Sequence, residues 1–232
     1  MNDEIKGMVE RYARRAGLED RYSPLRAEVV AARHDRERAL GRLFARHLVR
    51  APSALDVLEV GCGQGDNLLE LLRWGFVPTR LVGNELLPER AAAARSRLPA
   101  AVQVLEGDAT QLAMAPAQFD IVLQSTVFSS ILDDAFQQRL ADKMWGWVKP
   151  GGAVLWYDFT FNNPRNADVR GVPLRRVQAL FPQAQLHHRR VTLAPPLARV
   201  LCRWHPALYT LFNSLPPLRT HVLAWLAKPA QR

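Results

Sequence analysis

The stretch LEVGCGQGDNLLELL, residues 58–72, joins a short apolar run to a helical pattern through three closely spaced glycines. The apolar residues before Gly61 predict a buried strand, and the leucines after Asp66 recur at the spacing of one helix face. Gly61, Gly63 and Gly65 have no Cβ, so the turn can be tight and its backbone can approach a ligand closely. The first N–H groups of the next helix lack intrahelical partners and can face that ligand. The stretch therefore predicts a strand, a ligand-binding turn and a helix.

On both sides of this unit, short apolar runs alternate with helical stretches. Continuous apolar strands separated by helices predict a parallel sheet that is covered on both faces, with right-handed crossovers. Pro150-Gly151-Gly152 predicts a turn before the fifth run. The apolar runs cover residues 55–60, 80–85, 102–107, 119–124 and 153–159, and the helical stretches cover 66–74, 88–98 and 133–148.

The two ends of the chain add further elements to this α/β core. Residues 25–50 predict an amphipathic helix that begins at Ser23-Pro24 and ends before Ala51-Pro52. After residue 160 the pattern predicts a helix over 173–181, a strand over 185–193, a helical insertion over 195–215 broken at Pro206, and a last strand over 220–227. We therefore expect seven strands, with the last two joined by the insertion.

Length and composition exclude several classes of protein. The chain has 232 residues, of which 48% are hydrophobic and 23% are charged, so it can bury a core without disulfides or metals. No apolar run approaches the length of a membrane-spanning helix, and the N-terminus MNDEIKGMVERYARR lacks the apolar core of a secretion signal. Cys62 and Cys202 are 140 positions apart and form no zinc motif. These features predict a cytoplasmic protein.

Positive charge is concentrated in the C-terminal third. Residues 161–232 hold 11 Lys and Arg and one acid, Asp168, whereas residues 1–160 hold 20 bases and 21 acids. This asymmetry favours contact with an anionic partner such as a phosphorylated substrate, a membrane surface or nucleic acid. A solvated arginine-rich face is the alternative.

Polar residues follow the predicted strands at the points where those strands end. Glu85 ends the second strand, where a carboxylate can accept two hydrogen bonds from a ribose diol. Asp108 follows the third strand, where it can accept from an adenine amino group, and QSTVFSS (124–130) follows the fourth. Ligands of open α/β sheets bind at this carboxyl edge. The third glycine falls two residues after the second, and this GxGxG spacing departs from the dinucleotide-binding fingerprint.

Five features together resemble the class I S-adenosylmethionine (SAM)-dependent methyltransferases: LEVGCGQGDN (58–67), Glu85, GDA (107–109), FDIVLQS (119–125) and VKPGGAVLWYD (148–158). A weaker resemblance, to a bacterial subgroup found beside polysaccharide and secondary-metabolite enzymes, lies in QSTVFSSILDD (124–134), WYDFTFNNPRNADVRGVP (156–173), RRVTLAPPLARVL (189–201) and LRTHVLAWLAKP (218–229). The resemblance to the class I methyltransferases covers about residues 54–160. It implies a Rossmann-like, mostly parallel seven-stranded sheet with helices on both faces. It also implies an N-terminal helical lid (1–53), a SAM-binding core (54–160) and a basic substrate cap with closing strands (161–232).

The resemblance also assigns roles to residues by position. The glycine turn would lie against the methionine part of SAM, Glu59 near its amino group, Glu85 and Leu86 at the ribose, and Asp108 and Ala109 at the adenine. The residues implied to bind the cofactor are Glu59, Gly61, Cys62, Gly63, Gly65, Asn67, Glu85, Leu86, Asp108, Ala109, Gln124 and Ser125. Asn67 could equally be part of a polar first helical turn, and Cys62 a small packing residue.

The acceptor is expected to be a small hydroxylated molecule, such as a sugar or natural product, methylated on oxygen by in-line transfer. QSTV (124–127) stands where nucleobase methylases of similar sequence carry an NPPY-like tetrad, so we expect no N6-adenine methylation. Asp108, Asp133 and Asp134 make a thin set of acids, so no metal is expected. Amides and hydroxyls in DFTFNNPRN suit a hydroxylated acceptor, although Asn and Pro also favour turns. Candidate substrate contacts are Thr126, Phe128, Tyr157, Asn162, Asn163 and Arg165.

A base assists when the acceptor is a hydroxyl. Asp158, at the end of the fifth strand, is the first candidate, and a cap or salt bridge is its alternative role. His34, on the N-terminal helix, is the second, and a solvated histidine is its alternative. We set His205 and His221 aside.

Residues 196–228 combine apolar and aromatic side chains with arginines. This pattern fits a cap over the acceptor pocket, a membrane contact or a homodimer face, and no RNA-binding motif accompanies it. N-methylation of a natural product, RNA methylation through the basic face and a non-catalytic SAM-binding partner subunit remain alternative functions.

Overall fold

The computed structural model describes residues 3–14, 23–162 and 166–230. A seven-stranded sheet crosses this part of the chain in the order β3-β2-β1-β4-β5-β7-β6. β1 to β5 pair in parallel, and β7 runs antiparallel to both β5 and β6, so the predicted mostly parallel sheet is confirmed. The strands are β1 (Val57–Val60), β2 (Leu81–Glu85), β3 (Gln103–Glu106), β4 (Phe119–Ser125), β5 (Val148–Phe159), β6 (Gln185–Leu193) and β7 (Arg219–Ala227).

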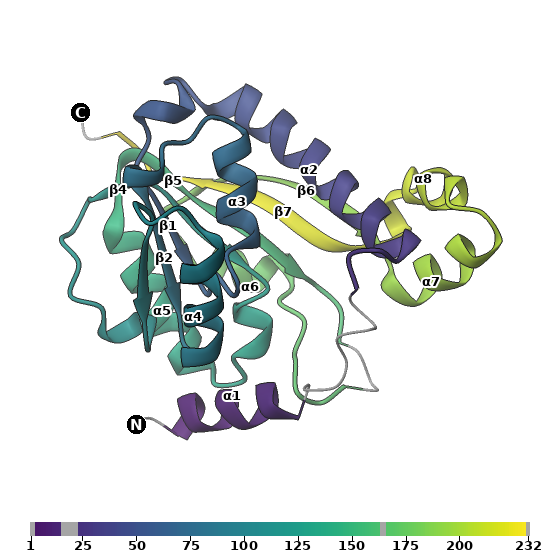
Figure 1. The fold of residues 1–232 in the computed structure, drawn as a ribbon, viewed down its shortest axis with the longest axis horizontal. Coiled ribbons are helices and arrows are strands. Elements are labelled where there is room, and N and C mark those ends of the chain that lie inside the picture. Colours follow the sequence, from purple (N-terminus) through teal and green to yellow (C-terminus); the bar gives the residue numbers. More distant parts are fainter. Residues whose placement is uncertain (1–2, 15–22, 163–165, 231–232) are drawn as a thin grey trace.

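Helices cover both faces of the sheet (Figure 1). Side chains from α2, α3 and α4 share one buried cluster with one face of the strands, and side chains from α5 and α6 share another with the opposite face. The helices are α1 (Asp3–Ala13), α2 (Ala27–His47), α3 (Asp66–Arg73), α4 (Pro88–Arg97), α5 (Asp134–Trp147), α6 (Leu174–Leu180), α7 (Pro195–Trp204) and α8 (Ala207–Asn213). None of these helices has the length and apolar character needed to cross a membrane.

The central strands are apolar on both sides because both of their faces are covered. Every residue of β1 is buried. In β4, Ile121 and Leu123 pack on the cluster that holds α2 to α4, whereas Val122 packs on the cluster that holds α5 and α6. Successive side chains of a strand point to opposite faces, so an uninterrupted apolar run is what a doubly covered sheet requires.

Two element boundaries differ from the sequence-based expectation. α2 begins at Ala27 rather than at Ser23-Pro24. The predicted turn before the fifth strand is instead an irregularity within β5, whose pairing with β4 shifts register there. Gly151 has a φ of 79°, and its N–H donates to the Lys228 carbonyl while the Lys228 N–H donates to the carbonyl of Gly152. The antiparallel partner therefore keeps these residues in the sheet.

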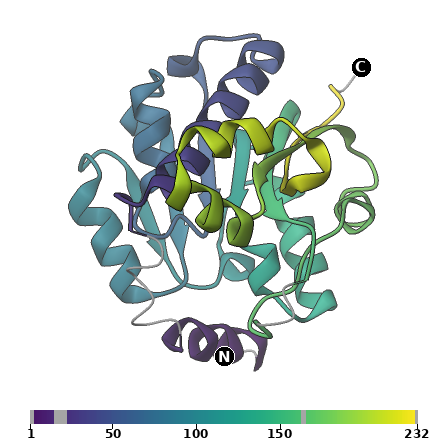
Figure 2. The same ribbon diagram turned by 90° about the vertical axis from the view of Figure 1, so that its right-hand side faces the viewer.

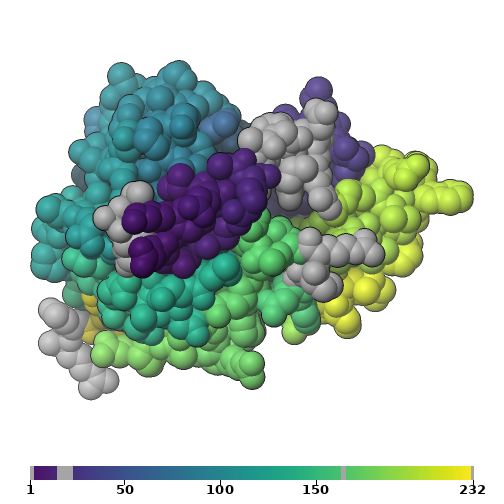
Figure 3. Space-filling view, turned by 90° about the horizontal axis from the view of Figure 1, so that it is seen from below, coloured from purple at the N-terminus to yellow at the C-terminus, as the bar shows by residue number. Residues whose placement is uncertain are grey.

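Two segments outside the sheet border its carboxyl edge. α1 packs through Ile5 and Met8 into the cluster of α5 and α6, and the Glu4 carboxylate accepts from the Leu132 N–H at 2.8 Å. The α7–α8 hairpin, residues 195–215, is inserted between β6 and β7 and lies beside the start of α2 (Figures 1 and 2). Seen from below, it forms one end of the molecule, away from α1 (Figure 3). The predicted helical insertion, with its break at Pro206, is confirmed.

Candidate functional site

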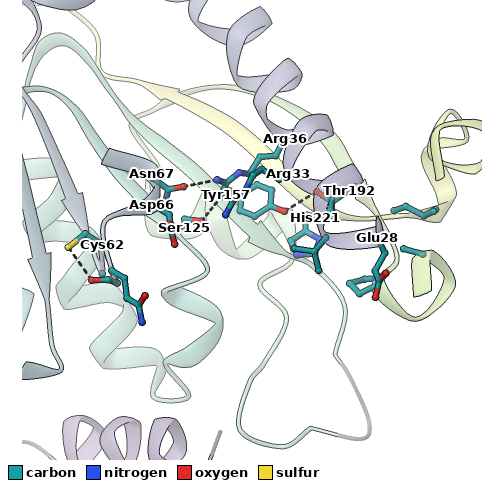
Figure 4. A pocket seen from close by; sticks show the side chains of 18 of the residues that line it. Glu28, Arg33, Arg36, Cys62, Asp66, Asn67, Ser125, Tyr157, Thr192 and His221 are labelled. Atoms are coloured by element: carbon teal, nitrogen blue, oxygen red, sulfur yellow. Dashed lines mark hydrogen bonds between the residues drawn. The ribbon is translucent and has the colours of Figure 1, made fainter. Parts of the chain in front are cut away.

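A cavity of about 420 Å³ opens beside the turn between β1 and α3. Its wall comes from segments far apart in the chain: the glycine turn, α2, the ends of β4 and β5, the junction of β6 with α7, and β7. Figure 4 shows side chains from these elements converging on one space. Cavities of this size at the carboxyl edge of a parallel sheet are typical ligand sites.

The glycine turn has a backbone that other residues would strain. Gly61, Gly63 and Gly65 have φ angles of 67°, 59° and 86°. A Cβ on Gly61 would lie 2.4 Å from a methyl group of Val127, and one on Gly63 would lie 2.5 Å from the Arg90 guanidinium. Glycine is required here both by the left-handed conformation and by the close approach of neighbouring groups.

A buried carboxylate lies beneath this turn. Glu59 is fully buried, and its Oε1 accepts from the Asn67 side chain at 2.5 Å. Its Oε2 has no hydrogen-bond partner among the described residues. Burial raises the pKa of Glu59 to about 8, and the Asn67 hydrogen bond and Arg36 oppose that rise. A buried acceptor without a partner is costly, which favours a donor supplied by a ligand.

Arg36 extends this polar chain from α2 into the cavity. Its guanidinium donates to the Asn67 Oδ1 at 2.7 Å and to the Glu70 carboxylate at 3.3 Å, and it lies 3.4 Å from the Ser125 hydroxyl. The Arg36 Nε is buried and has no partner among the described residues. Arg36 thus links α2 to α3 and leaves a donor available for a ligand.

The two acids that follow β2 and β3 are engaged with backbone N–H groups. Glu85 accepts from the Gly63 N–H at 2.8 Å and from the Leu87 N–H at 3.0 Å. Asp108 accepts from the N–H and the hydroxyl of Thr110 at 2.8 and 2.9 Å. Neither acid lines the cavity, which is bounded on this side by Arg90. Both acids lie at the carboxyl edge that the sequence predicted for them.

The far end of the cavity is built around Tyr157. The Tyr157 hydroxyl is 2.9 Å from the Thr192 hydroxyl, and the His221 ring stacks on the Tyr157 ring at 5.0 Å between centroids. Arg36 lies over the same ring at 5.3 Å (Figure 4). Burial, and to a smaller extent the positive charge of Arg36, lowers the pKa of His221 to about 4. His221 is therefore neutral at neutral pH, with its Nδ1 placed 3.1 Å from the Thr220 hydroxyl.

Two threonines next to this end have strained backbones. Thr126 and Thr192 have φ angles of 58° and 62°, which β-branched residues rarely adopt. The Thr126 N–H donates to the Tyr157 carbonyl, and the Thr192 N–H donates to the Asp35 carboxylate at 3.0 Å. Strain of this kind concentrates at functional sites.

The structure brings part of the predicted set together. Six predicted residues line the cavity: Gly61, Cys62, Gly63, Asn67, Ser125 and Tyr157. Burial raises the pKa of the Cys62 thiol to about 12, so it is no nucleophile at neutral pH. Eight further predicted residues lie near the carboxyl edge without lining the cavity: Glu59, Gly65, Glu85, Leu86, Asp108, Ala109, Gln124 and Thr126.

The remaining predicted residues lie elsewhere. Phe128 is fully buried against Trp156, and Asp158 is fully buried with its oxygens accepting from the N–H groups of Ser129 and Phe159. Burial raises the pKa of Asp158 to about 7. His34 is exposed outside the cavity wall, and the exposed Asn162 accepts from the Gly171 N–H. Asn163 and Arg165 lie outside the described residues.

Sequence reasoning missed Arg36, Thr192 and His221, although all three line the cavity. The signals were weak: Arg36 is one of several arginines on an amphipathic helix, and His221 had been set aside. Among the described residues, no group of three or more His, Cys, Asp or Glu side chains is arranged to hold a metal ion.

A model of the family described as "Methyltransferase domain" matches residues 57–152. Among curated proteins, the chain is 30% identical to the ribosomal protein L11 methyltransferase of Geobacter metallireducens over 114 residues. That match covers 49% of this chain and 36% of the relative, so the chain spans little more than a third of that protein's length.

Solved structures show the same fold. A possible histamine N-methyltransferase of Thermotoga maritima superposes with a TM-score of 0.64 at 16% identity, covering 94% of this chain and 99% of that one. Phosphoethanolamine N-methyltransferase 2 of Haemonchus contortus, solved with S-adenosyl-L-methionine, gives a TM-score of 0.61 at 16% identity over 84% of this chain and 52% of that one.

Proposed function

The chain carries a class I SAM-dependent methyltransferase domain, and on that premise we propose that it moves the SAM methyl group onto an oxygen of a small hydroxylated acceptor. The observation that carries the proposal is the cavity, which begins at the glycine turn and ends at Tyr157 and His221. One open cavity is thus bordered by a cofactor-type turn at one end and by polar side chains around Tyr157 at the other.

The residues at the turn fit SAM. The unpartnered Oε2 of Glu59 suits an ammonium group, and the unpartnered Nε of Arg36 suits a carboxylate, so together they match the charged ends of an amino acid. Glu85 would hold the ribose, and Asp108 and Ala109 the adenine. When bound, the sulfonium of SAM supplies an electrophilic methyl group.

The chain's own contribution is to orient the acceptor and exclude water. Tyr157 is partly buried and its hydroxyl is hydrogen-bonded to Thr192, so its position is determined before any ligand arrives. Holding two reactants in line in a preformed site can supply about 7–11 kcal/mol of the barrier reduction. The volume of about 420 Å³ lies in the range of small-ligand pockets.

An aliphatic hydroxyl also needs a group that takes its proton. Asp158 and His34 remain proposals for that role. To them we add His221, because it lines the cavity and contacts Tyr157, whereas both Asp158 oxygens already accept from backbone N–H groups. Its pKa of about 4 keeps the imidazole unprotonated at neutral pH and also makes it a weak base, so its place in the cavity is what supports this role. The free state of both cysteines supports a reducing compartment, the cytoplasm, for this reaction.

Methyl-labelled SAM tests the proposal. The purified protein is incubated with labelled SAM and an extract of its own host, and small molecules, lipids, protein and nucleic acid are then separated. We expect label in a small molecule and much less of it with Glu59→Gln, whereas Glu89→Gln, which changes an exposed carboxylate on α4, retains the reaction. Label in nucleic acid or protein would replace the small-molecule acceptor, and SAM binding without any transfer would favour a non-catalytic subunit.

A further inference from the structure

Four large apolar side chains are exposed on the α7–α8 hairpin. The exposed fractions are 55% for Val200, 83% for Trp204, 63% for Leu211 and 51% for Leu215. Val200 and Trp204 are four residues apart on α7 and so share one side of that helix. Exposed apolar side chains that gather on one projecting element are typical of interaction surfaces.

The opposite side of the hairpin is firmly packed. Ala198, Cys202 and Tyr209 form a buried cluster with Leu193, and alanines of α2 pack against it. The Tyr209 hydroxyl accepts from the Leu193 N–H. The exposed side chains are therefore held outward on a supported element, and folding of this chain has not buried them.

The hairpin itself is basic, because residues 195–215 contain Arg199 and Arg203 and no acid. No Asp or Glu follows Asp168, whereas residues 169–232 contain ten Lys and Arg. Arg203 is exposed on α7 between the two apolar positions. Arg190 is exposed on the edge strand β6 and lies over the half-exposed ring of Phe161. Charge complementarity thus favours an anionic partner that also accepts apolar side chains.

We propose that the α7–α8 hairpin docks on an anionic lipid bilayer. Trp204 and Val200 enter the boundary between headgroups and acyl chains, and Arg203 faces the lipid phosphates. Helices that lie in a membrane interface combine an apolar side carrying Trp or Leu with arginines, and Trp favours the headgroup level. An anionic leaflet attracts each nearby Lys or Arg and thereby adds to the apolar contribution.

Docking in this way has a consequence for the cavity. Pro195, Ala198 and Arg199 of α7 line the cavity, while Val200 and Trp204 of the same helix are exposed. A docked hairpin therefore holds the acceptor end of the cavity close to the bilayer surface. The docking surface itself does not depend on the methyl-transfer reaction.

Vesicle sedimentation tests the proposal on the intact protein. We expect the protein to sediment with vesicles of phosphatidylcholine mixed with phosphatidylglycerol, and far less with phosphatidylcholine alone. Trp204→Ser removes an exposed side chain and should weaken partitioning about tenfold. Arg203→Ser should weaken it about fivefold and make it less sensitive to salt.

Matched variants separate this surface from general basicity. Arg42→Ser changes an exposed arginine of α2, and Val49→Ser changes an exposed valine just beyond the end of that helix; both follow the α2 residues that contact the hairpin, Ala27 to Ala32, by ten positions or more. Both should sediment as the unaltered protein does, and thermal unfolding should be the same for all four variants. The proposal is overturned if the protein binds no vesicles or if all four variants lose binding equally. It is also overturned if Trp204→Ser instead abolishes self-association or RNA retention while vesicle binding is absent.

Discussion

Glu59 connects the glycine turn to the rest of the site. One of its oxygens accepts from Asn67, and the other is buried without a partner among the described residues. Asn67 in turn accepts from Arg36. A ligand at the turn would therefore meet the Glu59 carboxyl and the Arg36 guanidinium, which the Asn67 amide holds at a fixed separation. This arrangement suits a zwitterionic amino-acid group better than a phosphate.

Replacing Glu59 by glutamine should weaken cofactor binding. The amide keeps the shape but cannot ionise, whereas an ammonium group beside the Glu59 carboxyl favours its charged form, and a lost charged hydrogen bond costs about 1–3 kcal/mol. Titration calorimetry with S-adenosylhomocysteine measures the change. Glu89→Gln removes a charge from the exposed side of α4 and should leave the affinity unaltered. Equal affinities for all three proteins would remove Glu59 from the site.

His221→Asn should slow label transfer without weakening S-adenosylhomocysteine binding. General-base catalysis contributes about 10²–10⁴-fold, and the asparagine has no nitrogen that can take a proton. Because the pKa of His221 is about 4, the rate of the unaltered protein should fall only as the pH drops towards that value. His188→Asn, at an exposed position of the edge strand β6 that does not line the cavity, serves as the control. An unchanged rate and pH profile for His221→Asn would return the role to Asp158 or His34.

At the scale of elements, the strands and most of the helices could be predicted from local sequence. The run at residues 58–72 combines buried strand, glycine turn and helix within fifteen residues, so all of its signals are local. The irregularity at Gly151 depends on pairing with Lys228, which is 77 positions away. The sequence Pro150-Gly151-Gly152 predicts a turn because the partner strand that keeps these residues in the sheet is distant in the chain.

The contrast between local signals and contacts of distant residues also explains which site residues could be predicted. Gly61, Gly63 and Asn67 follow from one motif, and Ser125 follows from the end of a strand. Arg36 and His221 are 185 positions apart, and only the folded sheet brings both onto Tyr157. No periodicity in either helix or strand separates these two from the neighbouring arginines and histidines.

The start of α5 depends on a side-chain cap. The Asp133 carboxylate accepts from the N–H of Phe136, satisfying one of the donors that a helix leaves unpaired at its N-terminus. Asp133→Ala should lower the free energy of unfolding by about 0.5–2 kcal/mol. Urea unfolding measures the change, with Glu106→Ala as the control, since Glu106 makes an exposed ion pair with Arg95 that contributes little. A loss no larger than that of the control would show that the cap is not stabilising.

At the scale of the whole molecule, two buried acids make stability depend on pH. The pKa is raised to about 8 for Glu59 and to about 7 for Asp158, in both cases mainly by burial. The folded state then holds protons that the unfolded state has released, so the free energy of unfolding falls as pH rises through these values.

Between pH 7 and 8.5 this fall should amount to about 1–2 kcal/mol. Urea unfolding at the two pH values measures it, and Glu59→Gln should reduce the difference because the amide does not titrate. His221 titrates below this window, so it does not contribute. A free energy of unfolding that rises with pH would show that these acids are ionised in the folded protein.

We propose that cofactor and acceptor occupy the two ends of one cavity. A crystal structure with S-adenosylhomocysteine is the most direct test of that arrangement. We expect the amino-acid end of the ligand to lie against Gly61–Gly65, with its ammonium at Glu59 and its carboxylate at Arg36. We also expect the sulfur to face the space between Ser125, Tyr157 and His221. A ligand bound away from the glycine turn, or a sulfur directed away from His221, would contradict the arrangement.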